Sequence, residues 1–306
     1  MTLPEHFVRK LLVCIVLSAA FYGAWVIYGG IDDVMAAASR IGWQGWAIIL
    51  GLSLFNYALR FVRWGYYLNH LGCNVPAGAN LVAYLAGFGF TTTPGKVGEA
   101  VRSIYLKPYG VSYMQSLAAF FVERLVDLLA MIVVASLAAY AFESMRWLVG
   151  VTLLVTIAVV PLVHSKRLPQ WLAARAEASV SERLSTTLGQ VVKMLGASAQ
   201  LLRSTPLYGG VLLGLVAWFA EGYALYVVLD RMGADIPVLL AAGIYGVSIL
   251  AGVVSFVPGG LGGTEIVMGS LLVLSGVDAP LAVSAVIICR VATLWFAVAI
   301  GLVFLA

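Results

Sequence analysis

Long apolar segments without internal charge run through this chain from its first residues to its last. A helix needs about 20 apolar residues to cross a bilayer, so segments of this kind are typical of membrane spans. The runs are continuous rather than alternating, which favours helices over the strands of a closed barrel. The pattern predicts full spans at residues 11–28, 43–68, 116–142, 147–163, 207–229 and 279–305.

Two further apolar stretches are broken by glycine and proline. Residues 79–106 are interrupted at 91–98, and residues 239–275 are interrupted at 255–264. Each half has about 10 to 18 residues, which at about 1.5 Å per residue is too short to cross comfortably. We therefore expect re-entrant helical hairpins, since broken backbone at this depth must be buried in protein or line a wet cavity. The alternative is that each stretch crosses twice.

The two breaks carry related sequences, TPGKVGE at 93–99 and VPGGLGGTE at 257–265. Three landmarks share an offset of 166 residues: Glu99 with Glu265, Gly110 with Gly276, and Arg124 with Arg290. Upstream the offset is 161 residues, for Gly72 with Gly233, Pro76 with Pro237, and Arg60 with Glu221. Repeats of this size in a hydrophobic chain indicate a transporter built from two related halves.

These observations predict an all-α polytopic membrane protein with two inverted-topology repeats, each containing a broken re-entrant hairpin, and an N-terminal span. The first repeat begins on an inward-running span and the second on an outward-running span, so the hairpins open on opposite sides and meet near the midplane. We divide the chain into 1–42 (cytoplasmic N-terminus, first span and outer loop), 43–142 (first repeat), 143–206 (connecting span and basic cytoplasmic segment) and 207–306 (second repeat).

Composition and charge orient this arrangement. Hydrophobic residues make up 62% of the chain and charged residues only 10%, which excludes an ordinary soluble domain. With a cytoplasmic N-terminus, thirteen of the eighteen basic residues fall on the inner side, as the positive-inside rule requires, and three fall outside: Arg40, Arg146 and Arg231. We expect a bacterial inner-membrane protein with both termini in the cytoplasm. The net charge of +4 then reflects its loops rather than nucleic-acid binding.

Two segments leave alternatives open. Residues 11–28 are either an uncleaved first span or a signal peptide cleaved after 36–38; the length of the run and the intervening Asp32 and Asp33 favour the span. The basic segment 164–205 is expected to form amphipathic helices at the inner surface, in contact with anionic lipid, with a plain linker as the alternative.

Two arginines are predicted to lie in membrane-embedded helices, where a charge costs roughly 2.5 to 3.5 kcal/mol unless it is compensated. Arg124 has Glu123 beside it and Asp127 one turn further on, so an internal ion pair is one interpretation. Arg290 has no acidic residue within a turn. It must pair with an anionic ligand or with a distant acid, for which the candidates are Glu99, Glu265 and Glu221.

The breaks offer further candidates. Glu99 and Glu265 either cap the helices that follow, with Thr264 as an N-cap beside Glu265, or are buried carboxylates that pair with arginine or titrate during transport. The break glycines are expected to let backbone N–H groups and helix N-termini face a phosphate: Gly95, Gly98, Gly259, Gly260, Gly262 and Gly263. Lys96 adds charge on the inner side only.

Polar residues of the earlier spans have two interpretations. Arg60 and its repeat mate Glu221 either line the two entrances or snorkel to opposite interfaces, and snorkelling is the favoured interpretation for Arg60 and Arg63. The chain has no GxxxxGK[ST], HExxH or GxSxG motif and no two-histidine metal spacing. We therefore expect no cofactor, no metal, no ATP hydrolysis and no enzymatic activity.

Three motifs together resemble the lysylphosphatidylglycerol synthase transmembrane-domain family: PGKVGE at 94–99, FVERLVD at 121–127 and VPGGLGGTE at 257–265. The resemblance covers the chain from about Trp43 to its end. In bifunctional members, a soluble aminoacyltransferase domain charges phosphatidylglycerol, and the membrane domain moves the product to the outer leaflet. Because 306 residues leave no room for that soluble domain, the resemblance implies the lipid-translocating half alone.

The sequence therefore predicts a protein that flips or scrambles a lipid with an anionic head group. Its phosphate is expected near Arg290 or Arg124, with Glu99 and Glu265 pairing with these arginines or gating the site. The partners are membrane lipids, and a homo-oligomer is compatible with the sequence. Two alternatives stay open: an ion-coupled carrier of small solutes, and an accessory protein or enzyme of polyprenyl-linked glycan or hopanoid metabolism, with Glu99, Glu265 or Asp127 as acid–base groups.

Overall fold

The computed structural model describes residues 30–139, 141–164, 167–177 and 182–305, with residues 13, 16, 19, 20, 22–24 and 27 of the preceding segment. All regular structure in these residues is helical. The predicted span at 11–28 lies largely outside the described residues. The elements are α2 (Ile31–His70), α3 (Ala77–Phe88), η1 (Pro94–Val101), α4 (Arg102–Leu106), η2 (Lys107–Tyr109), α5 (Tyr113–Ala139), η3 (Glu143–Met145), α6 (Arg146–His164), α7 (Arg167–Glu177), α8 (Glu182–Leu201), α9 (Ser204–Arg231), α10 (Val238–Val254), η4 (Pro258–Gly260), α11 (Gly263–Leu274), α12 (Ala279–Arg290), η5 (Val291–Trp295) and α13 (Phe296–Leu305).

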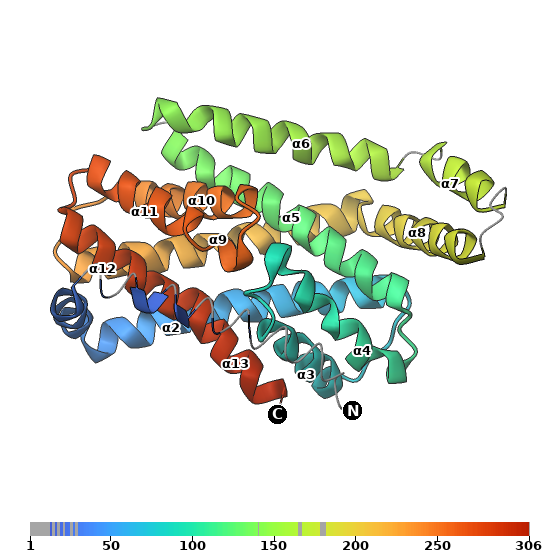
Figure 1. Cartoon of the computed structure of the whole chain (residues 1–306), viewed down its shortest axis with the longest axis horizontal. Coiled ribbons are helices and arrows are strands. Elements are labelled where there is room, and N and C mark those ends of the chain that lie inside the picture. The colour runs from blue at the N-terminus through green and yellow to red at the C-terminus, as the bar shows by residue number, and fades with distance from the viewer. Residues whose placement is uncertain are drawn as a thin grey trace.

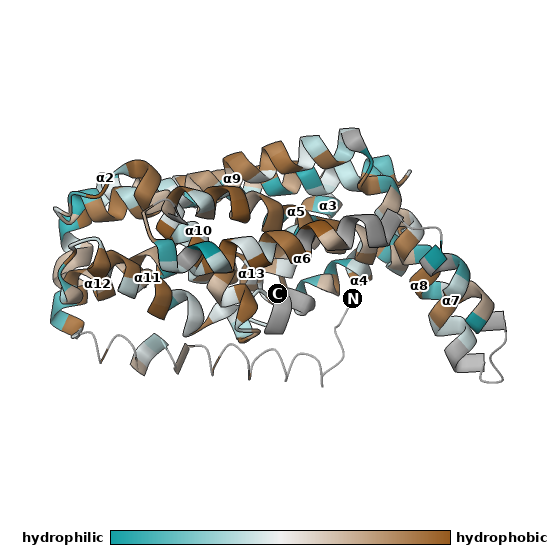
Figure 2. Ribbon diagram, turned by 90° about the horizontal axis from the view of Figure 1, so that it is seen from above, coloured by the Kyte–Doolittle hydropathy of each residue, from teal (hydrophilic) through white to brown (hydrophobic). Residues whose placement is uncertain are grey.

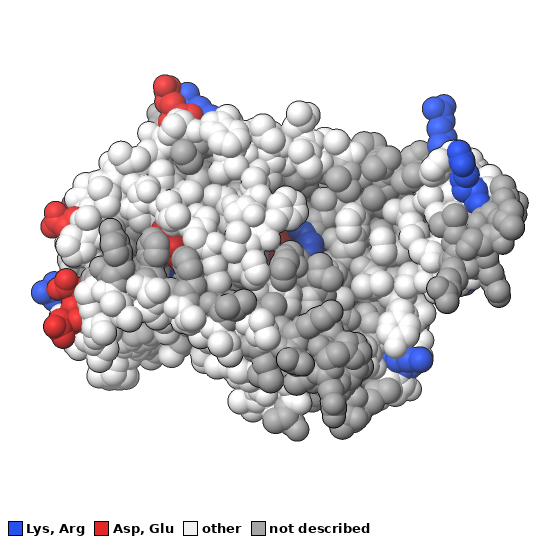
Figure 3. Space-filling view, viewed as in Figure 1, with Lys and Arg blue, Asp and Glu red and all other residues white. Residues whose placement is uncertain are grey.

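The long helices run along the longest dimension of the molecule, as Figure 1 shows for α5, α6 and α9. Figure 2 shows that hydrophobic residues predominate along the middle of the bundle. In the described part of the chain, three helices are long and apolar enough to cross a membrane: Ile31–His70, Thr205–Arg231 and Ala279–Leu305. Figure 3 shows charged side chains gathered towards the two ends of the long axis. The chain is therefore an all-α polytopic membrane protein, as predicted.

The sequence before Gly42 differs from the prediction. In place of an outer loop, α2 already begins at Ile31, and the helix changes direction at Gly42, whose φ of 65° and ψ of 168° are not helical. Glycine adopts a positive φ without steric cost, which permits this kink. Figure 1 shows the first part of α2 nearly end-on at one end of the molecule. A short helix across that end thus precedes the predicted span that starts at Trp43.

Both broken stretches fold back as hairpins with short arms. The first hairpin consists of α3, η1 and α4, and the second of α10, η4 and α11. The arms α3 and α11 have 12 residues each, or about 18 Å, against about 30 Å for the hydrocarbon core. Figure 1 shows the hairpins approaching from opposite ends of the bundle, and η1 contacts η4. These lengths favour re-entrant hairpins over two full crossings.

The turns that precede the two hairpins have the same geometry. Gly72 and Gly233 have positive φ angles of 75° and 83°. In both turns the amide of the next residue donates to the carbonyl five residues earlier, at 2.9 Å, which is a Schellman helix end. Pro76 and Pro237 then stand immediately before α3 and α10. The landmarks at an offset of 161 residues therefore occupy equivalent turns; the inverted repeat as a whole stays a prediction.

Glycine brings the central helices close together. α5 packs along α10. A Cβ added to Gly246 of α10 would lie 2.7 Å from the Ala135 nitrogen and 2.9 Å from its Cα, so no side chain fits there. On α9, a Cβ added to Gly214 would lie 2.9 Å from Nη1 of Arg63. Small residues at these contacts admit the backbone of one neighbour and a buried arginine of another.

The predicted basic segment forms helices rather than a plain linker. α7 and α8 lie at one end of the bundle, where Figure 2 shows hydrophilic and hydrophobic residues on both. α8 packs against α5 and α7 against α8. Their contact with anionic lipid stays a prediction.

Candidate functional site

A cavity of about 320 Å³ lies where both hairpins meet α2, α5, α9 and α12. Most of its lining is apolar, and its charged lining residues are Arg60, Glu99, Arg124, Asp127, Glu221 and Arg290. All of these were candidates from the sequence, and Arg124 and Arg290 therefore border one shared cavity. Gly259 and Gly260 also line it, whereas Gly98, Gly262, Gly263 and Glu265 are not among the lining residues.

On the side of the second hairpin, Arg290 and Glu265 form a direct buried ion pair. Nε of Arg290 donates to Oε1 of Glu265 at 2.7 Å, and Nη2 donates to the carbonyl of Gly259 at 2.6 Å. The other oxygen of Glu265, Oε2, accepts from the Gly262 amide at 2.7 Å at the start of α11. Both interpretations of Glu265 thus hold together, because one carboxylate caps α11 and also pairs with Arg290.

Tyr22 joins this ion pair from the segment before α2. Its hydroxyl donates to Oε1 of Glu265 at 2.8 Å and accepts from Nε of Arg290 at 3.2 Å. We refer to Tyr22, Gly259, Glu265 and Arg290 as the α11–α12 cluster. The sequence gave no sign of Tyr22, since a tyrosine in an apolar run is common and its partners lie more than 240 residues away.

On the side of the first hairpin there is a larger group, which we call the α2–α5 cluster. It contains Arg60, Arg63, Arg102 and Arg124 with Glu99, Glu123 and Asp127. Every member except Arg124 is buried. Arg102 donates to Glu123 and to Glu99, at 2.8 Å each, and Arg63 donates to Asp127 at 2.6 Å. Arg63 and Arg102 do not line the cavity, so these hydrogen bonds are made behind it.

Arg60 and Arg124 are the arginines of the α2–α5 cluster that line the cavity. Nη2 of Arg124 lies 3.1 Å from Asp127, 3.2 Å from Glu123 and 3.9 Å from Glu99. The predicted ion pair between Arg124 and Asp127 is therefore confirmed. Nη2 of Arg60 lies 3.6 Å from both Glu123 and Asp127, and its guanidinium lies 5.2 Å from the ring of Trp218.

The interpretation of Arg60 and Arg63 as snorkelling residues is wrong. They are 5% and 0% exposed, and their partners are carboxylates of α5 rather than interfacial water. Arg102 is also buried, so these three arginines do not contribute to the basic excess of the inner loops. A stripe of buried polar and aromatic residues along one face of α2 was the available signal: Ser53, Asn56, Tyr57, Arg60, Arg63, Trp64 and Tyr67.

Glu221 and Arg60 border the same cavity rather than two entrances. Glu221 is 4% exposed and accepts a hydrogen bond from the hydroxyl of Tyr245 on α10. Tyr57, which also lines the cavity, donates to the carbonyl of Thr293 at 2.5 Å. Within the described residues, no three His, Cys, Asp or Glu side chains are grouped so that they could hold a metal ion.

The glycines of the breaks do not present a row of free N–H groups to the cavity. The amide of Gly98 donates to Oγ1 of Thr93, that of Gly260 to the carbonyl of Val257, and that of Gly262 to Glu265. The positive φ angles of 65° to 82° at Gly259, Gly260 and Gly262 explain why glycine is needed there. Glu99 does not cap a helix either, because it lies near the end of η1. The side chains of residues 94–97 lie outside the described part, so the roles of Lys96 and Gly95 stay predictions.

The cavity is associated with a recess on the long side of the bundle. Figure 3 shows basic atoms beside acidic atoms in a hollow near the middle of this face, far from the charged ends. At the same place Figure 1 shows α5 passing the loop between α10 and α11. The side chain of Arg124 is 19% exposed, the largest value in the α2–α5 cluster. The face that carries the recess runs parallel to the spanning helices.

The fold and the cavity define a multi-pass α-helical membrane protein with a charged cavity between two broken hairpins. Residues 11–301 match the family described as the lysylphosphatidylglycerol synthase TM region, and the chain belongs to this family. A UPF0104 membrane protein of Methanothermobacter thermautotrophicus is 26% identical over 94% of this chain and 90% of its own length. A UPF0104 membrane protein of Pyrococcus horikoshii is 24% identical over 96% of this chain and 95% of its own length.

Proposed function

We propose that this protein moves a lipid with an anionic head group between the two leaflets, as a flippase or scramblase that does not hydrolyse ATP. The observation that carries the proposal is a cavity with charged lining inside a membrane-spanning bundle, next to a recess on its lateral face. The head group passes through the cavity while the acyl chains stay in the bilayer. Membership of the TM-region family supports this role.

The energetics of the buried charges also support it. Charged side chains inside a membrane bundle are expensive, and those that occur usually mark a pathway for a polar substrate. A head group that leaves water must exchange its hydration for protein contacts, and a cavity lined by Arg60, Arg124 and Arg290 offers such contacts to an anion. In the same proposal the protein lies in the cytoplasmic membrane, with α7 and α8 on the cytoplasmic side.

Transbilayer movement in proteoliposomes tests the proposal. Head-labelled phosphatidylglycerol and phosphatidylethanolamine are placed in both leaflets, and a membrane-impermeant quencher reports the fraction that reaches the outer leaflet. We expect the protein to accelerate movement of phosphatidylglycerol relative to protein-free vesicles. Uptake of a soluble tracer without lipid movement would instead identify a small-solute carrier, and a chemically altered lipid would identify an enzyme.

A matched pair of tryptophan substitutions ties the movement to the cavity. Val253 lines the cavity and is 47% exposed, so Val253→Trp narrows the cavity without repacking the core. Val303 is 73% exposed and does not line the cavity. We expect Val253→Trp to slow lipid movement strongly and Val303→Trp to leave it unchanged. Equal rates in the two variants would mean that the lipid does not use this cavity.

A further inference from the structure

The α2–α5 cluster has an excess of positive charge. Four arginines face three carboxylates, so the cluster carries a formal charge of +1. We infer that Arg60 and Arg124 bind a phosphate monoanion in the cavity and that Arg290 holds the second hairpin in place instead of binding it. The assignment of this phosphate to a lipid head group rests on the proposed function; the phosphate site itself does not.

The carboxylates of the cluster are already engaged from behind. Asp127 accepts from Arg63 at 2.6 Å and from Nε1 of Trp218 at 3.0 Å, both through Oδ1. Oε2 of Glu123 accepts from Arg102 at 2.8 Å. Arg63 and Arg102 thus take the short hydrogen bonds, and Arg60 and Arg124 are left with longer ion pairs on the cavity side.

The donors of Arg60 and Arg124 are the second observation. Nε and Nη2 of both residues are buried atoms that make no hydrogen bond. Arg60 is 5% exposed and lines the cavity, where donors are almost always satisfied in folded proteins. A guanidinium presents its N–H groups as a planar fork that matches two oxygens of a phosphate. A monoanion held by both arginines supplies these acceptors and neutralises the excess charge.

Arg290 differs from Arg124 in this respect. Its Nε and Nη2 donate to Glu265, Tyr22 and Gly259, within the α11–α12 cluster. In the first half, the equivalent pair of Arg124 and Glu99 is separated by 3.9 Å, because Arg102 takes Glu99 at 2.8 Å. The structure therefore leaves the arginine of α5 available to a ligand and commits the arginine of α12 to the protein.

The ligand is a phosphate with a single negative charge, from a phosphodiester lipid or from inorganic phosphate. Binding to purified protein in detergent distinguishes them, with short-chain phosphatidylglycerol, the matching diacylglycerol and inorganic phosphate as probes. The fluorescence of Trp218, which contacts both Arg60 and Asp127, is a local reporter. We expect phosphatidylglycerol to bind and diacylglycerol not to bind; competition by inorganic phosphate alone would identify the free ion as the ligand.

The variants are Arg60→Gln and Arg124→Gln, with Arg146→Gln as the control, since Arg146 is an exposed surface residue at the start of α6. We expect each cavity variant to weaken binding about 10- to 100-fold, the range for losing a charged hydrogen bond, and the control to bind as wild type. Wild-type affinity in both cavity variants would overturn the inference. So would an Arg290→Gln variant that is equally well folded and loses as much affinity as Arg124→Gln.

A stability measurement separates binding from a structural role. Removing Arg60 leaves three arginines against three carboxylates, so the ligand-free Arg60→Gln protein should unfold at the wild-type temperature or higher. Phosphatidylglycerol should raise the unfolding temperature of the wild type but not of Arg60→Gln. A marked drop for ligand-free Arg60→Gln would show a structural role instead. If the wild type binds the lipid but moves none, the site stands and the proposed function fails; if it moves lipid and the variants bind normally, the reverse holds.

Discussion

At the scale of the residue, the ion pair of Arg290 and Glu265 carries the clearest stability prediction. Both side chains are almost fully buried, so Glu265→Gln leaves a guanidinium without its counter-charge. Loss of one partner of a buried pair costs about 3–5 kcal/mol, chiefly because the other charge stays buried. We expect a drop of this size in the free energy of unfolding of Glu265→Gln, measured by chemical denaturation in detergent.

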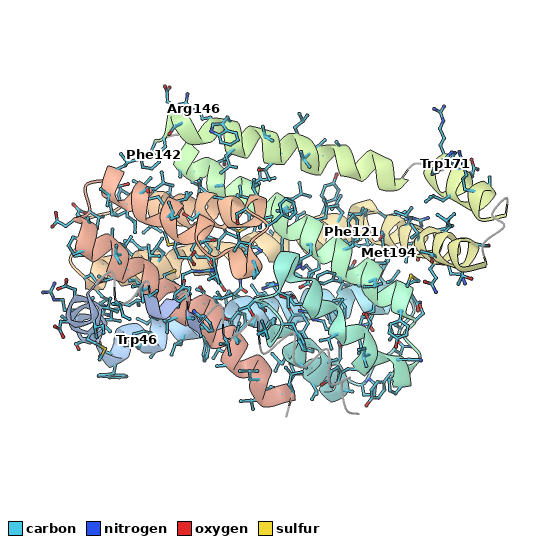
Figure 4. The ribbon with its side chains drawn as sticks, viewed as in Figure 1. Trp46, Phe121, Phe142, Arg146, Trp171 and Met194 are labelled. Carbon is cyan, nitrogen blue, oxygen red and sulfur yellow. The ribbon has the colours of Figure 1, made fainter. Side chains whose placement is uncertain are left out.

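An exposed pair of the same chemistry is the control. Arg146 and Glu143 lie 2.9 Å apart with side chains that are 54% and 83% exposed. Figure 4 shows Arg146 at the start of α6, at the edge of the bundle. Glu143→Gln should change the free energy of unfolding by less than about 1 kcal/mol. Similar losses in both variants would mean that Glu265 is not desolvated in the folded protein.

The partners of the buried arginines could be predicted only where they are close in sequence. Asp127 is one turn from Arg124, and this pair was foreseen. Arg63 and Arg102 were placed in inner loops, because their carboxylates are 64 and 21 residues away and become neighbours only when α2, α4 and α5 pack. For Arg290 the sequence gave three candidate acids, and the packing of α11 on α12 selects Glu265.

At the scale of the element, helices and hairpin breaks were predictable because the bilayer imposes long apolar runs and glycine with proline interrupts them. The predicted segments at 116–142, 147–163 and 207–229 correspond to α5, α6 and α9 with small shifts at their ends. The helix before Gly42 was missed, since residues 30–42 contain charges and lie outside any run long enough to span. The backbone path of each break, with Gly259, Gly260 and Gly262 at positive φ, depends on the packing around it.

The contact between α5 and α10 gives the prediction for this scale. A Cβ at Gly246 would lie within 3.0 Å of the Ala135 backbone, and backbone cannot move aside as a flexible side chain can. Overpacking of this kind costs about 1–3 kcal/mol, so Gly246→Ala should lower the free energy of unfolding accordingly. Thermal or chemical unfolding in detergent measures the loss.

Gly51→Ala is the matched substitution at an open position. Gly51 lies in the interior of α2 and has nothing within 4 Å of an added Cβ. Alanine is favoured over glycine in a helix by about 0.8–1 kcal/mol, so this variant should be as stable as wild type or more stable. If both variants gain stability, α5 and α10 do not approach each other as closely as described.

At the scale of the whole molecule, the distribution of charge predicts which end faces the cytoplasm. Arg175 of α7 and Arg146 of α6 are both exposed and lie at opposite ends of the bundle, as Figure 1 shows for these helices. The positive-inside rule places α7 in the cytoplasm. We expect Arg175→Cys to react with an impermeant thiol reagent only in inverted vesicles, and Arg146→Cys only in right-side-out cells.

The native cysteines limit the background of this labelling. Cys73 and Cys289 are buried, and Cys14, which lies outside the described residues, is replaced by serine in the test background. Labelling of both introduced cysteines from the same side would contradict a single crossing by α6. Labelling of each from the side opposite to that expected would reverse the orientation while preserving the fold.

The α2–α5 cluster also bears on how the protein is made. α5 is 27 residues long but carries Glu123, Arg124 and Asp127, and a charge at the centre of a helix opposes insertion by roughly 2.5 to 3.5 kcal/mol. Those charges are neutralised by Arg60, Arg63 and Arg102, which are synthesised earlier and are themselves unpaired until α5 arrives. During synthesis, α2 and the first hairpin should therefore wait beside the translocation channel, and release into lipid should follow the emergence of α5. A nascent chain that ends before α5 should stay cross-linkable to the channel.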